Sequence, residues 1–348
     1  MIELYVPGRL CLFGEHSDWA GRWRVEDASI RPGYCLVAGT DQGLAASAEL
    51  CADRLEIESE LPDGRRTGPV RIPWTDEALA GAARAGGFFA YAAGAAAELR
   101  ARGVTSGAVL RIRSDLPVRK GLSSSAATCV LVARAFDRLY GLGLGERGEI
   151  EVAFAGERRT GSECGRMDQI CAYGRRATFV RFDGEALEVE VLAPAAPLHL
   201  LAVDLRREKD TRRILRDLNA CFPAAPGAVA AAVRDALGPK NEALLARART
   251  AVASGDARAV GALMTEAQAL FDAQVAPACP ELRAPRLHEV LAHPAARELA
   301  LGGKGVGSGG DGSAQLVLPG AAARDALAKR LEADLGVGCL PLTIEAVA

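Results

Sequence analysis

Hydrophobic and polar positions alternate over short stretches in the first third of the chain, which predicts strands joined by turns. Residues 43–49 alternate as a half-buried strand does, and a Pro-Asp-Gly turn at residues 62–64 separates two further runs. Residues 78–102 are rich in alanine and predict a helix that ends at Gly103. The strands predicted in this part are residues 4–6, 10–13, 34–38, 43–49, 54–58, 70–72 and 109–112.

Helical periodicity dominates the rest of the chain. Ala127, Leu131, Ala135 and Leu139 recur at every fourth position, which predicts a helix that Gly141 ends. Asp183-Gly184 predicts a hairpin turn between two strands. The other predicted helices are residues 149–158, 167–173, 209–221, 228–237, 240–254, 257–274 and 321–335, and the other strands are residues 178–182, 187–192, 198–204, 314–318 and 340–344.

The length and a short proline-bearing segment predict two domains. A chain of 348 residues exceeds the usual size of one domain, and residues 194–197 form the best candidate for a linker. We therefore expect an α+β fold with an N-terminal domain over residues 1–195 and a C-terminal domain over residues 196–348.

Composition and charge exclude several classes of protein. Charged residues make up 25% and apolar residues 49%, with a mean hydropathy of +0.09, which is typical of a globular protein. The net charge of −2 argues against general binding to nucleic acid or anionic membranes. No apolar run reaches the roughly 18 residues of a membrane span, and no secretion signal is recognisable. Nine cysteines without a CxxC pair indicate a reduced, cytoplasmic protein; the oligomeric state is not indicated.

Two patterns do not support the function that they suggest. Gly305, Gly307 and Gly310 spell GxGxxG, but the residues that follow predict a strand, whereas a dinucleotide-binding motif requires a helix there. The mixed-charge run over residues 206–216 is interpreted as the solvated face of a helix.

The first candidate functional stretch is PGRLCLFGEHSD, residues 7–18. Glu15, His16 and Asp18 follow an apolar strand directly, and burying such groups is costly unless a ligand binds them. Sugar hydroxyls suit carboxylates that accept hydrogen bonds. A solvated turn is the alternative.

The second stretch, residues 115–136, places Gly121 and the serines at 123, 124 and 125 directly before an apolar helix. The N-terminus of a helix binds phosphate through unpaired N–H groups and the helix dipole, and a serine hydroxyl can bind Mg²⁺. An ordinary serine N-cap explains the pattern equally well.

The third stretch, residues 156–174, carries Glu157 and Asp168 on either side of a glycine-rich turn. One acid can serve as a general base while the other holds a metal ion. Taken alone, two acids at helix ends are the simpler interpretation.

In this order and spacing, the stretches resemble the GHMP kinases, the family of galactokinase, homoserine kinase, mevalonate kinase and phosphomevalonate kinase. Residues 7–18 look like the first family motif, residues 121–127 (GLSSSAA) like the second, and residues 305–313 (GVGSGGDGS) like the third. CGRMDQ at residues 164–169 and GEHSD at residues 14–18 are most similar to galactokinase and related sugar-1-kinases. The resemblance implies two α+β domains with the active site in the cleft between them.

The resemblance also implies roles for individual residues. Asp168 would be the catalytic base, and Arg9 would lie near the transferred phosphoryl group. Ser125 and Glu157 would hold Mg²⁺. The sugar would meet Glu15, His16, Asp18, Cys164 and Gly165. ATP would bind at Gly121, Leu122, Ser123, Ser124, Ser125, Ala126, Gly307, Gly309 and Gly310.

The reaction expected from this resemblance is ATP + sugar → sugar 1-phosphate + ADP, with a sugar or sugar acid phosphorylated at its anomeric hydroxyl. A mevalonate-type alcohol kinase and a catalytically silent sugar- and ATP-binding regulator are the alternatives. Three departures from the galactokinase pattern concern the substrate: Trp19 in place of a tyrosine, Asp311 in place of a glycine, and the unlike segment 203–215.

Overall fold

The computed structural model describes residues 1–116 and 122–346, and it confirms the predicted α+β class. The chain divides into two compact units: unit 1 comprises Met1–Arg9 and Gly39–Arg175, and unit 2 comprises Leu10–Ala38 and Arg176–Ala348. This division differs from the predicted boundary at residue 195, because two long strands near the N-terminus each contribute residues to both units. These strands are β1 (Ile2–Phe13) and β2 (Gly33–Cys51).

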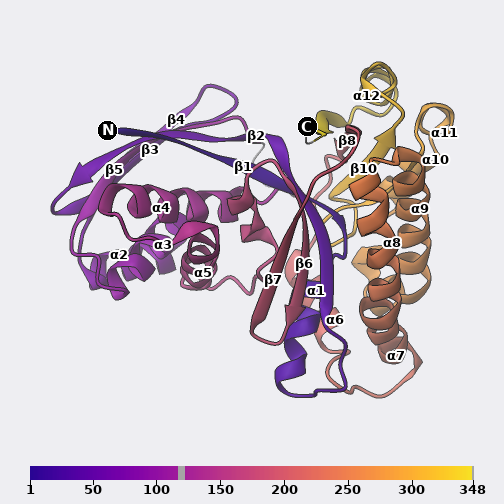
Figure 1. The fold of residues 1–348 in the computed structure, drawn as a ribbon, viewed down its shortest axis with the longest axis horizontal. Coiled ribbons are helices and arrows are strands. Elements are labelled where there is room, and N and C mark those ends of the chain that lie inside the picture. The colour runs from indigo at the N-terminus through magenta and orange to yellow at the C-terminus, as the bar shows by residue number, and fades with distance from the viewer. Residues whose placement is uncertain (117–121, 347–348) are drawn as a thin grey trace. The chain divides into compact units, whose positions relative to one another are not determined.

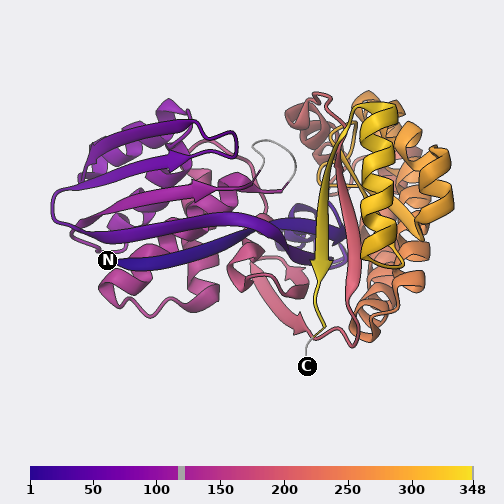
Figure 2. The same cartoon turned by 90° about the horizontal axis from the view of Figure 1, so that it is seen from above.

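In unit 1, one face of a β-sheet is covered by helices. The strand order is β4-β3-β5-β2, with β1 paired to β2, and β3 and β5 run parallel. Helices α2 to α5 pack on one face (Figure 1), and none of the helices in the described part of the chain covers the opposite face (Figure 2). The bounds are β3 (Arg54–Glu60), β4 (Arg66–Pro73), β5 (Gly107–Ser114), α2 (Asp76–Ala85), α3 (Ala90–Ala101), α4 (Ser124–Tyr140), α5 (Gly145–Arg158) and the short helix η2 (Asp168–Tyr173).

The alternation of side chains explains this one-sided arrangement. Leu55 and Ile57 of β3 are fully buried, while Arg54 and Glu56, which alternate with them, point to the other face. The single helix predicted over residues 78–102 is wrong in one respect, because it is interrupted between α2 and α3. Gly86 and Gly87 adopt φ of 74° and 87° there, a backbone conformation that favours glycine and ends a helix.

Unit 2 contains a second sheet with helices packed on it. The strand order is β11-β8-β10-β9, all antiparallel, with Leu316 opposite Leu201. The hairpin predicted at Asp183-Gly184 is confirmed by β6 and β7. The strand bounds are β6 (Ala177–Asp183), β7 (Ala186–Leu192), β8 (Leu198–Asp204), β9 (Gly302–Gly305), β10 (Ser313–Leu318) and β11 (Gly338–Ile344).

The core of unit 2 lies between this sheet and its helices. Leu201 and Leu316 of the sheet pack with Leu287, Leu327 and Leu331 of the helices. The helices are α1 (Ser17–Arg22), α6 (Thr211–Asn219), α7 (Ala228–Asp235), α8 (Asn241–Ser254), α9 (Ala257–Gln274), α10 (Pro285–Ala292), α11 (Pro294–Leu299) and α12 (Ala321–Leu335), with short helical turns η1 (Trp23–Val25), η3 (Ala236–Lys240), η4 (Ala276–Ala278) and η5 (Pro280–Arg283).

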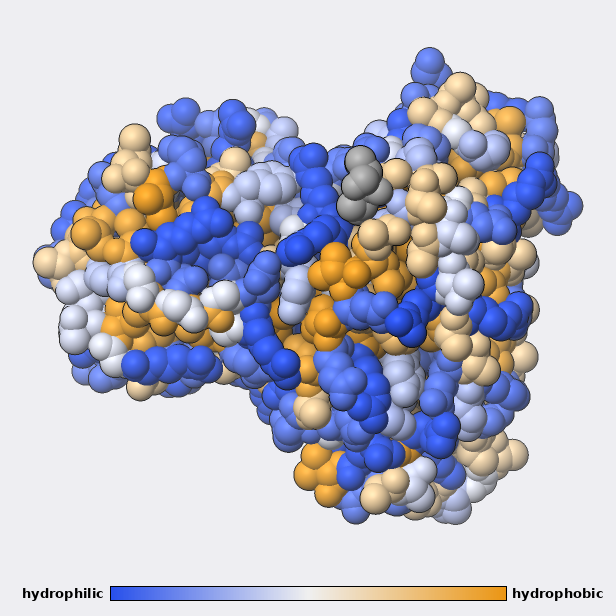
Figure 3. Space-filling view, viewed as in Figure 1, coloured by the Kyte–Doolittle hydropathy of each residue, from blue (hydrophilic) through white to orange (hydrophobic). Residues whose placement is uncertain are grey.

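The visible surface carries hydrophilic and hydrophobic residues interspersed with one another (Figure 3). Among the described residues, no helix is long and apolar enough to cross a membrane.

Candidate active site

In unit 1, strand β1 comes unusually close to the start of the serine motif. A Cβ on Gly8 would lie 2.9 Å from the carbonyl oxygen of Leu122 and 2.5 Å from Cδ2 of Leu116. The backbone N–H of Arg9 donates to the same Leu122 oxygen at 3.1 Å. Glycine at position 8 therefore allows Arg9 to lie directly beside the second motif.

The serines at the start of α4 do not form an ordinary N-cap. Ser123 adopts the left-handed conformation (φ 57°, ψ 45°), and its side chain makes no capping hydrogen bond. Of the neighbouring predicted nucleotide-binding residues, Ser124 begins the helix, Leu122 and Ala126 are buried, and Gly121 lies outside the described residues. A non-glycine residue in this conformation stores strain, which is often associated with function.

A close crossing of two helices positions Glu157 in the last turn of α5. A Cβ on Gly94 of α3 would lie 2.2 Å from the carbonyl oxygen of Gly156, and a Cβ on Gly156 would lie 2.5 Å from Cα of Ala95. Two glycines thus let α3 and α5 touch through their backbones immediately before Glu157.

The carboxylate of Glu157 is held by two neutral hydrogen-bond donors. The Ser125 hydroxyl donates to Oε1 at 3.0 Å, and the Gln169 amide donates to Oε2 at 2.7 Å. Burial raises the pKa of Glu157 to about 7, the nearby charge of Asp168 adds to the rise, and the two hydrogen bonds and Arg9 oppose it. A buried carboxylate with so little positive charge around it is suited to receive a cation.

Asp168 lies at the start of η2 and forms an ion pair with Arg9. The side chain of Asp168 is 32% exposed, whereas that of Arg9 is only 4% exposed. The buried arginine therefore holds a carboxylate that a ligand can still reach. Cys164 and Gly165 lie half-buried in the loop before η2, and the Gln169 amide is 4.0 Å from the Cys164 sulfur.

A second buried arginine, Arg134 of α4, ties these elements together. It forms a bidentate pair with Glu149 of α5, with contacts of 2.6 to 3.0 Å. It also donates to the carbonyl oxygens of Ala172 in η2, at 2.6 Å, and of Tyr5 in β1, at 2.9 Å. The four elements that carry Arg9, Ser125, Glu157 and Asp168 thus share one anchor.

In unit 2, Glu15 of the first motif pairs with a lysine of β9. Lys304 forms an ion pair with Glu15 and donates to the carbonyl oxygen of Gly305 at 2.8 Å, and both side chains are almost fully buried. Asp18 lies half-buried in the first turn of α1.

His16 is a neutral side chain fixed by three neighbours. Its Nδ1 accepts from the Trp19 indole at 3.1 Å, so the ring proton is on Nε2 and donates to the carbonyl oxygen of Ser308 at 3.3 Å. Its ring also stacks on Phe271. Burial lowers the pKa of His16 to about 4, and the charges of Lys209 and Lys304 contribute. Trp19, noted as a departure from the galactokinase pattern, therefore orients the histidine.

The third glycine-rich motif forms the loop between β9 and β10, and the strand predicted after it is confirmed. Gly307, Gly309 and Gly310 adopt φ of 69° to 79° and line a pocket together with Glu15 and Lys304. The rest of the pocket wall is largely apolar, with residues such as Leu244, Leu270, Phe271, Leu282 and Leu287.

Asp311 has a structural contact that its place in the motif did not suggest. Its carboxylate accepts a hydrogen bond from the backbone N–H of Leu287 at 3.0 Å. Leu287 lies in the first turn of α10, where the N-cap residue is Ala284 and supplies no side-chain cap. Asp311 therefore caps a helix rather than adding an unassigned charge to the loop.

The structure thus brings the predicted residues together in two groups, each within one unit. Arg9, Ser125, Glu157 and Asp168 form the group in unit 1, and Glu15, His16, Gly307, Gly309 and Gly310 form the group in unit 2. The motifs alone did not identify Gln169, Arg134, Lys209 and Lys304. Gln169 is the last residue of the CGRMDQ motif and Lys304 directly precedes the third motif, but neither had an assigned role, whereas Arg134 and Lys209 gave no sequence signal beyond their charge.

The chemistry of the unit 1 group fits a magnesium ion bound together with phosphate. Mg²⁺ takes oxygen ligands and usually binds through one or two protein groups, with phosphate oxygens and water completing its shell. The Ser125 hydroxyl and the Glu157 carboxylate provide two such oxygens, 3.0 Å apart.

In sequence, the chain matches a GHMP kinase family model and several galactokinases. Residues 90–175 match the family model "GHMP kinases N terminal domain". A galactokinase of Streptomyces coelicolor is 29% identical, over 98% of this chain and 91% of that protein. A galactokinase of Thermotoga maritima is 27% identical, but the match covers 54% of this chain and about half (48%) of the relative.

Solved structures of galactokinase and mevalonate kinase share the fold. Lactococcus lactis galactokinase complexed with galactose superposes with a TM-score of 0.75 at 19% identity, covering 99% of this chain and 93% of that one. Mevalonate kinase of L. major in complex with R-mevalonate gives 0.73 at 20% identity, covering 100% and 97%. The solved structures show the shared fold, and the sequence relatives carry the name galactokinase. They confirm the resemblance that the three motifs predict: the chain is similar to the GHMP kinases, with galactokinases among the proteins it matches in sequence.

Proposed function

We propose that this chain is an ATP-dependent kinase that transfers the γ-phosphoryl group to the anomeric hydroxyl of a sugar or sugar acid, yielding a sugar 1-phosphate and ADP. The observation that carries the proposal is the unit 1 group, in which the Arg9–Asp168 ion pair lies beside the Ser125–Glu157 hydrogen bond. A base for the acceptor hydroxyl and oxygen ligands for a metal ion are the two things that phosphoryl transfer asks of a protein.

In this mechanism, Asp168 accepts the proton of the acceptor hydroxyl as that oxygen attacks the γ-phosphorus. The adjacent guanidinium of Arg9 orients the carboxylate and offsets negative charge on the transferred group. The backbone amides at the start of α4 hold the phosphates. Ser125 and Glu157 would hold Mg²⁺, which would supply positive charge against the negative charge of the phosphates.

The unit 2 group supports a polar acceptor. Glu15 and Lys304 place a carboxylate and an ammonium group on the pocket wall beside the third motif, and the ring of His16 next to them is held by Trp19 and Ser308. The hydroxyl groups of a sugar can form hydrogen bonds with such charged groups. The residues we assign to the sugar are Glu15, His16, Asp18, Cys164 and Gly165.

A mevalonate-type alcohol kinase is the second candidate, and one observation favours it. Most of the wall of the unit 2 pocket is apolar, which suits an acceptor with hydrocarbon surface. A catalytically silent regulator is less well supported, since the base and the second-motif serine are both in place.

The test is ADP release with ATP and Mg²⁺ against a panel of free sugars, sugar acids and R-mevalonate, followed by phosphorus NMR of the product. The proposal predicts ADP release with at least one sugar or sugar acid and a phosphate on the anomeric carbon. Release with mevalonate alone would support the second candidate. A flat panel alongside tight sugar binding would support the regulator and contradict a kinase.

A further inference from the structure

The segment between β8 and α6 contains one charged side chain that differs from its neighbours. Arg206, Arg207, Glu208 and Asp210 are exposed, whereas Lys209 is half-buried. This corrects the interpretation of the mixed-charge run as a uniformly solvated helix face.

Lys209 lies against the third glycine-rich motif. Its ammonium group donates to the carbonyl oxygen of Gly309 at 2.7 Å. A Cβ on Gly310 would lie 3.6 Å from Cδ of Lys209, and a Cβ on Gly312 only 2.8 Å from Cε and 2.9 Å from the nitrogen. The small residues of the motif therefore make room for this lysine.

The charge of Lys209 is not matched by an acid. Among the described residues, it forms no ion pair, and a carbonyl oxygen is its one hydrogen-bond acceptor, although an ammonium group has three donors. Burial lowers the pKa of Lys209 to about 8, against a small opposing effect of Glu15, so the group remains mostly charged at neutral pH. Enclosing a charge without a counter-charge is unfavourable unless a ligand supplies one.

Lys209 has neighbours in both sets of assigned residues: it contacts Gly309 and Gly310, which the resemblance assigns to ATP, and it lies within charge range of Glu15 and His16, which are assigned to the acceptor. Its charge acts on both Glu15 and His16, and His16 contacts Ser308 of the same loop. The Thr211 and Ser308 hydroxyls lie 3.4 Å apart beside the loop and add further hydrogen-bonding groups. Lys304, the other lysine at this loop, is already neutralised by Glu15.

The arginines nearest to the first motif are all occupied by acids. Arg22 pairs with Glu185, Arg24 with Asp183 and Arg31 with Glu242. These three side chains therefore need no anionic ligand, in contrast to Lys209.

We infer that the acceptor carries an anionic oxygen group, as a sugar acid does, and that Lys209 is the residue that selects it. This inference rests on the proposed function, because it concerns the acceptor of that reaction. The shared chemistry is a carboxylate or a phosphate, and a phosphate of the nucleotide is the other source that the test must distinguish.

The experiment compares matched acidic and neutral acceptors: D-galacturonate with D-galactose, and D-glucuronate with D-glucose, at saturating ATP. We expect a higher kcat/KM for the acidic member of at least one pair. Lys209→Met, which keeps the length of the stem, should lower kcat/KM for the acid by about ten- to a hundredfold, the usual effect of a lost charged hydrogen bond. The neutral member and the KM for ATP should change less than about twofold.

Three variants keep the test independent of folding defects. Gly312→Ala displaces the ammonium without removing its charge and should produce a smaller loss on the acid alone, and Lys209→Arg should retain part of the preference. Lys240→Met removes an exposed lysine that pairs with Asp235 in the same unit and should change neither substrate.

Several outcomes would overturn the inference. An equal loss of kcat/KM with acidic and neutral acceptors would show that Lys209 only stabilises the glycine-rich loop. A raised KM for ATP with unchanged acceptor preference would assign the lysine to the nucleotide. If no sugar is turned over, the proposed function fails, but calorimetric binding of the same sugars without ATP still tests the role of Lys209. Binding of the acidic sugar that is lost in Lys209→Met would support the inference. Equal binding of acidic and neutral sugars would contradict it.

Discussion

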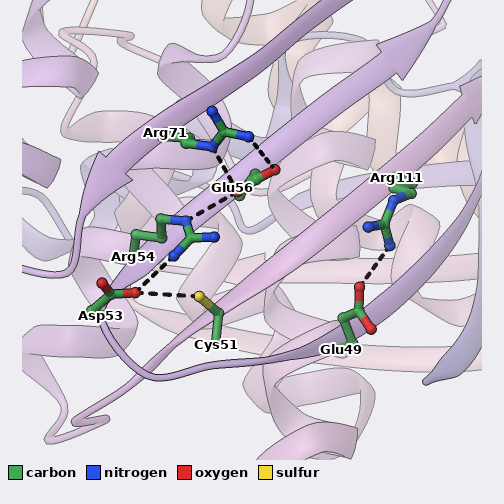
Figure 4. Close-up of polar contacts among 7 residues, drawn as sticks. All are labelled: Glu49, Cys51, Asp53, Arg54, Glu56, Arg71 and Arg111. Carbon is green, nitrogen blue, oxygen red and sulfur yellow. Dashed lines mark hydrogen bonds and ion pairs between the residues drawn. The ribbon is translucent and has the colours of Figure 1, made fainter.

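Two glutamates of unit 1 occupy opposite environments and differ accordingly. Glu56 lies on the helix-free face of the sheet, where Arg71 and Arg54 donate to its carboxylate at 2.9 and 3.0 Å, as Figure 4 shows. These hydrogen bonds lower its pKa to about 2. Glu157 lies among helices with a hydroxyl and an amide as its donors, and burial raises its pKa to about 7. The first carboxylate has its positive partners within the protein, whereas the second lacks them and is suited to receive a metal ion.

The largest effect is expected at the base beside Glu157. Asp168→Asn keeps the shape of the side chain but removes its ability to take a proton, so kcat should fall by at least about two orders of magnitude. Binding of a non-hydrolysable ATP analogue should persist. The matched control is Glu56→Gln, which removes a carboxylate from the outer face and should leave kcat unchanged. An active Asp168→Asn variant would exclude Asp168 as the base.

The second-largest effect is expected from the ion pair between Arg134 and Glu149, which holds the elements of the unit 1 group in place. Replacing Arg134 with Met and Glu149 with Leu together removes a buried ion pair without leaving a lone charge, so the double variant should remain folded. Its kcat should nevertheless fall by about ten- to a hundredfold, because η2 and β1 lose their shared donor and small displacements of reacting groups are costly.

The single variant Arg134→Met provides the contrast, since it leaves Glu149 buried without its partner and should be strongly destabilised. Thermal unfolding and kcat measured on both variants separate stability from positioning. A double variant that is both stable and fully active would show that the pair serves folding alone.

The two glutamates should also give pH dependences of opposite sign. In metal-free protein, the folded state keeps the Glu157 proton up to about pH 7, while the unfolded chain releases it near 4.5, so this residue lowers stability as pH rises between these values. For Glu56, the folded pKa of about 2 lies below 4.5, so its stabilising contribution is present above 4.5 and is lost as pH falls toward 2.

Denaturant unfolding with a chelator present measures both contributions. Glu157→Gln should flatten the stability profile between pH 4.5 and 7, and Glu56→Gln should flatten it below 4.5. Unchanged profiles in both windows would remove the contrast between the two sites.

The smallest effect is expected from Ser125→Ala. The hydroxyl supplies one of two protein oxygens, so its loss should raise the half-saturating Mg²⁺ concentration only severalfold, with little change in stability. Ser124→Ala is the neighbouring control, since its side chain is not one of the two assigned metal ligands. Equal Mg²⁺ requirements in both variants and the unmodified protein would exclude Ser125 from the metal site.

Part of this picture follows from the sequence, and the rest depends on long-range packing. The motifs indicated Arg9, Ser125, Glu157 and Asp168, because residue types and local spacing carry their chemistry. The partners of Arg134 and Lys209 lie 129 and 100 residues away, at Tyr5 and Gly309. Sequence periodicity cannot show such long-range contacts. For the same reason, it cannot predict that Glu157 and Glu56 have different partners and different pKa values.

The boundaries of the two units also depend on long-range contacts that the local sequence does not show. Local composition marks a break at residues 194–197, but the assignment of residues 10–38 to unit 2 depends on strand pairing, as between β2 and β6. A proline-bearing segment indicates where the chain turns. The extent of a compact unit depends instead on which strands pair with one another.

The most direct test of the account is a Mg²⁺ titration of kinase activity for Glu157→Gln and Glu56→Gln side by side. We predict that Glu157→Gln raises the half-saturating Mg²⁺ concentration by about tenfold or more, while Glu56→Gln matches the unmodified protein. Equal Mg²⁺ dependence in all three proteins would contradict the claim that the buried group of unit 1 is the phosphoryl-transfer site.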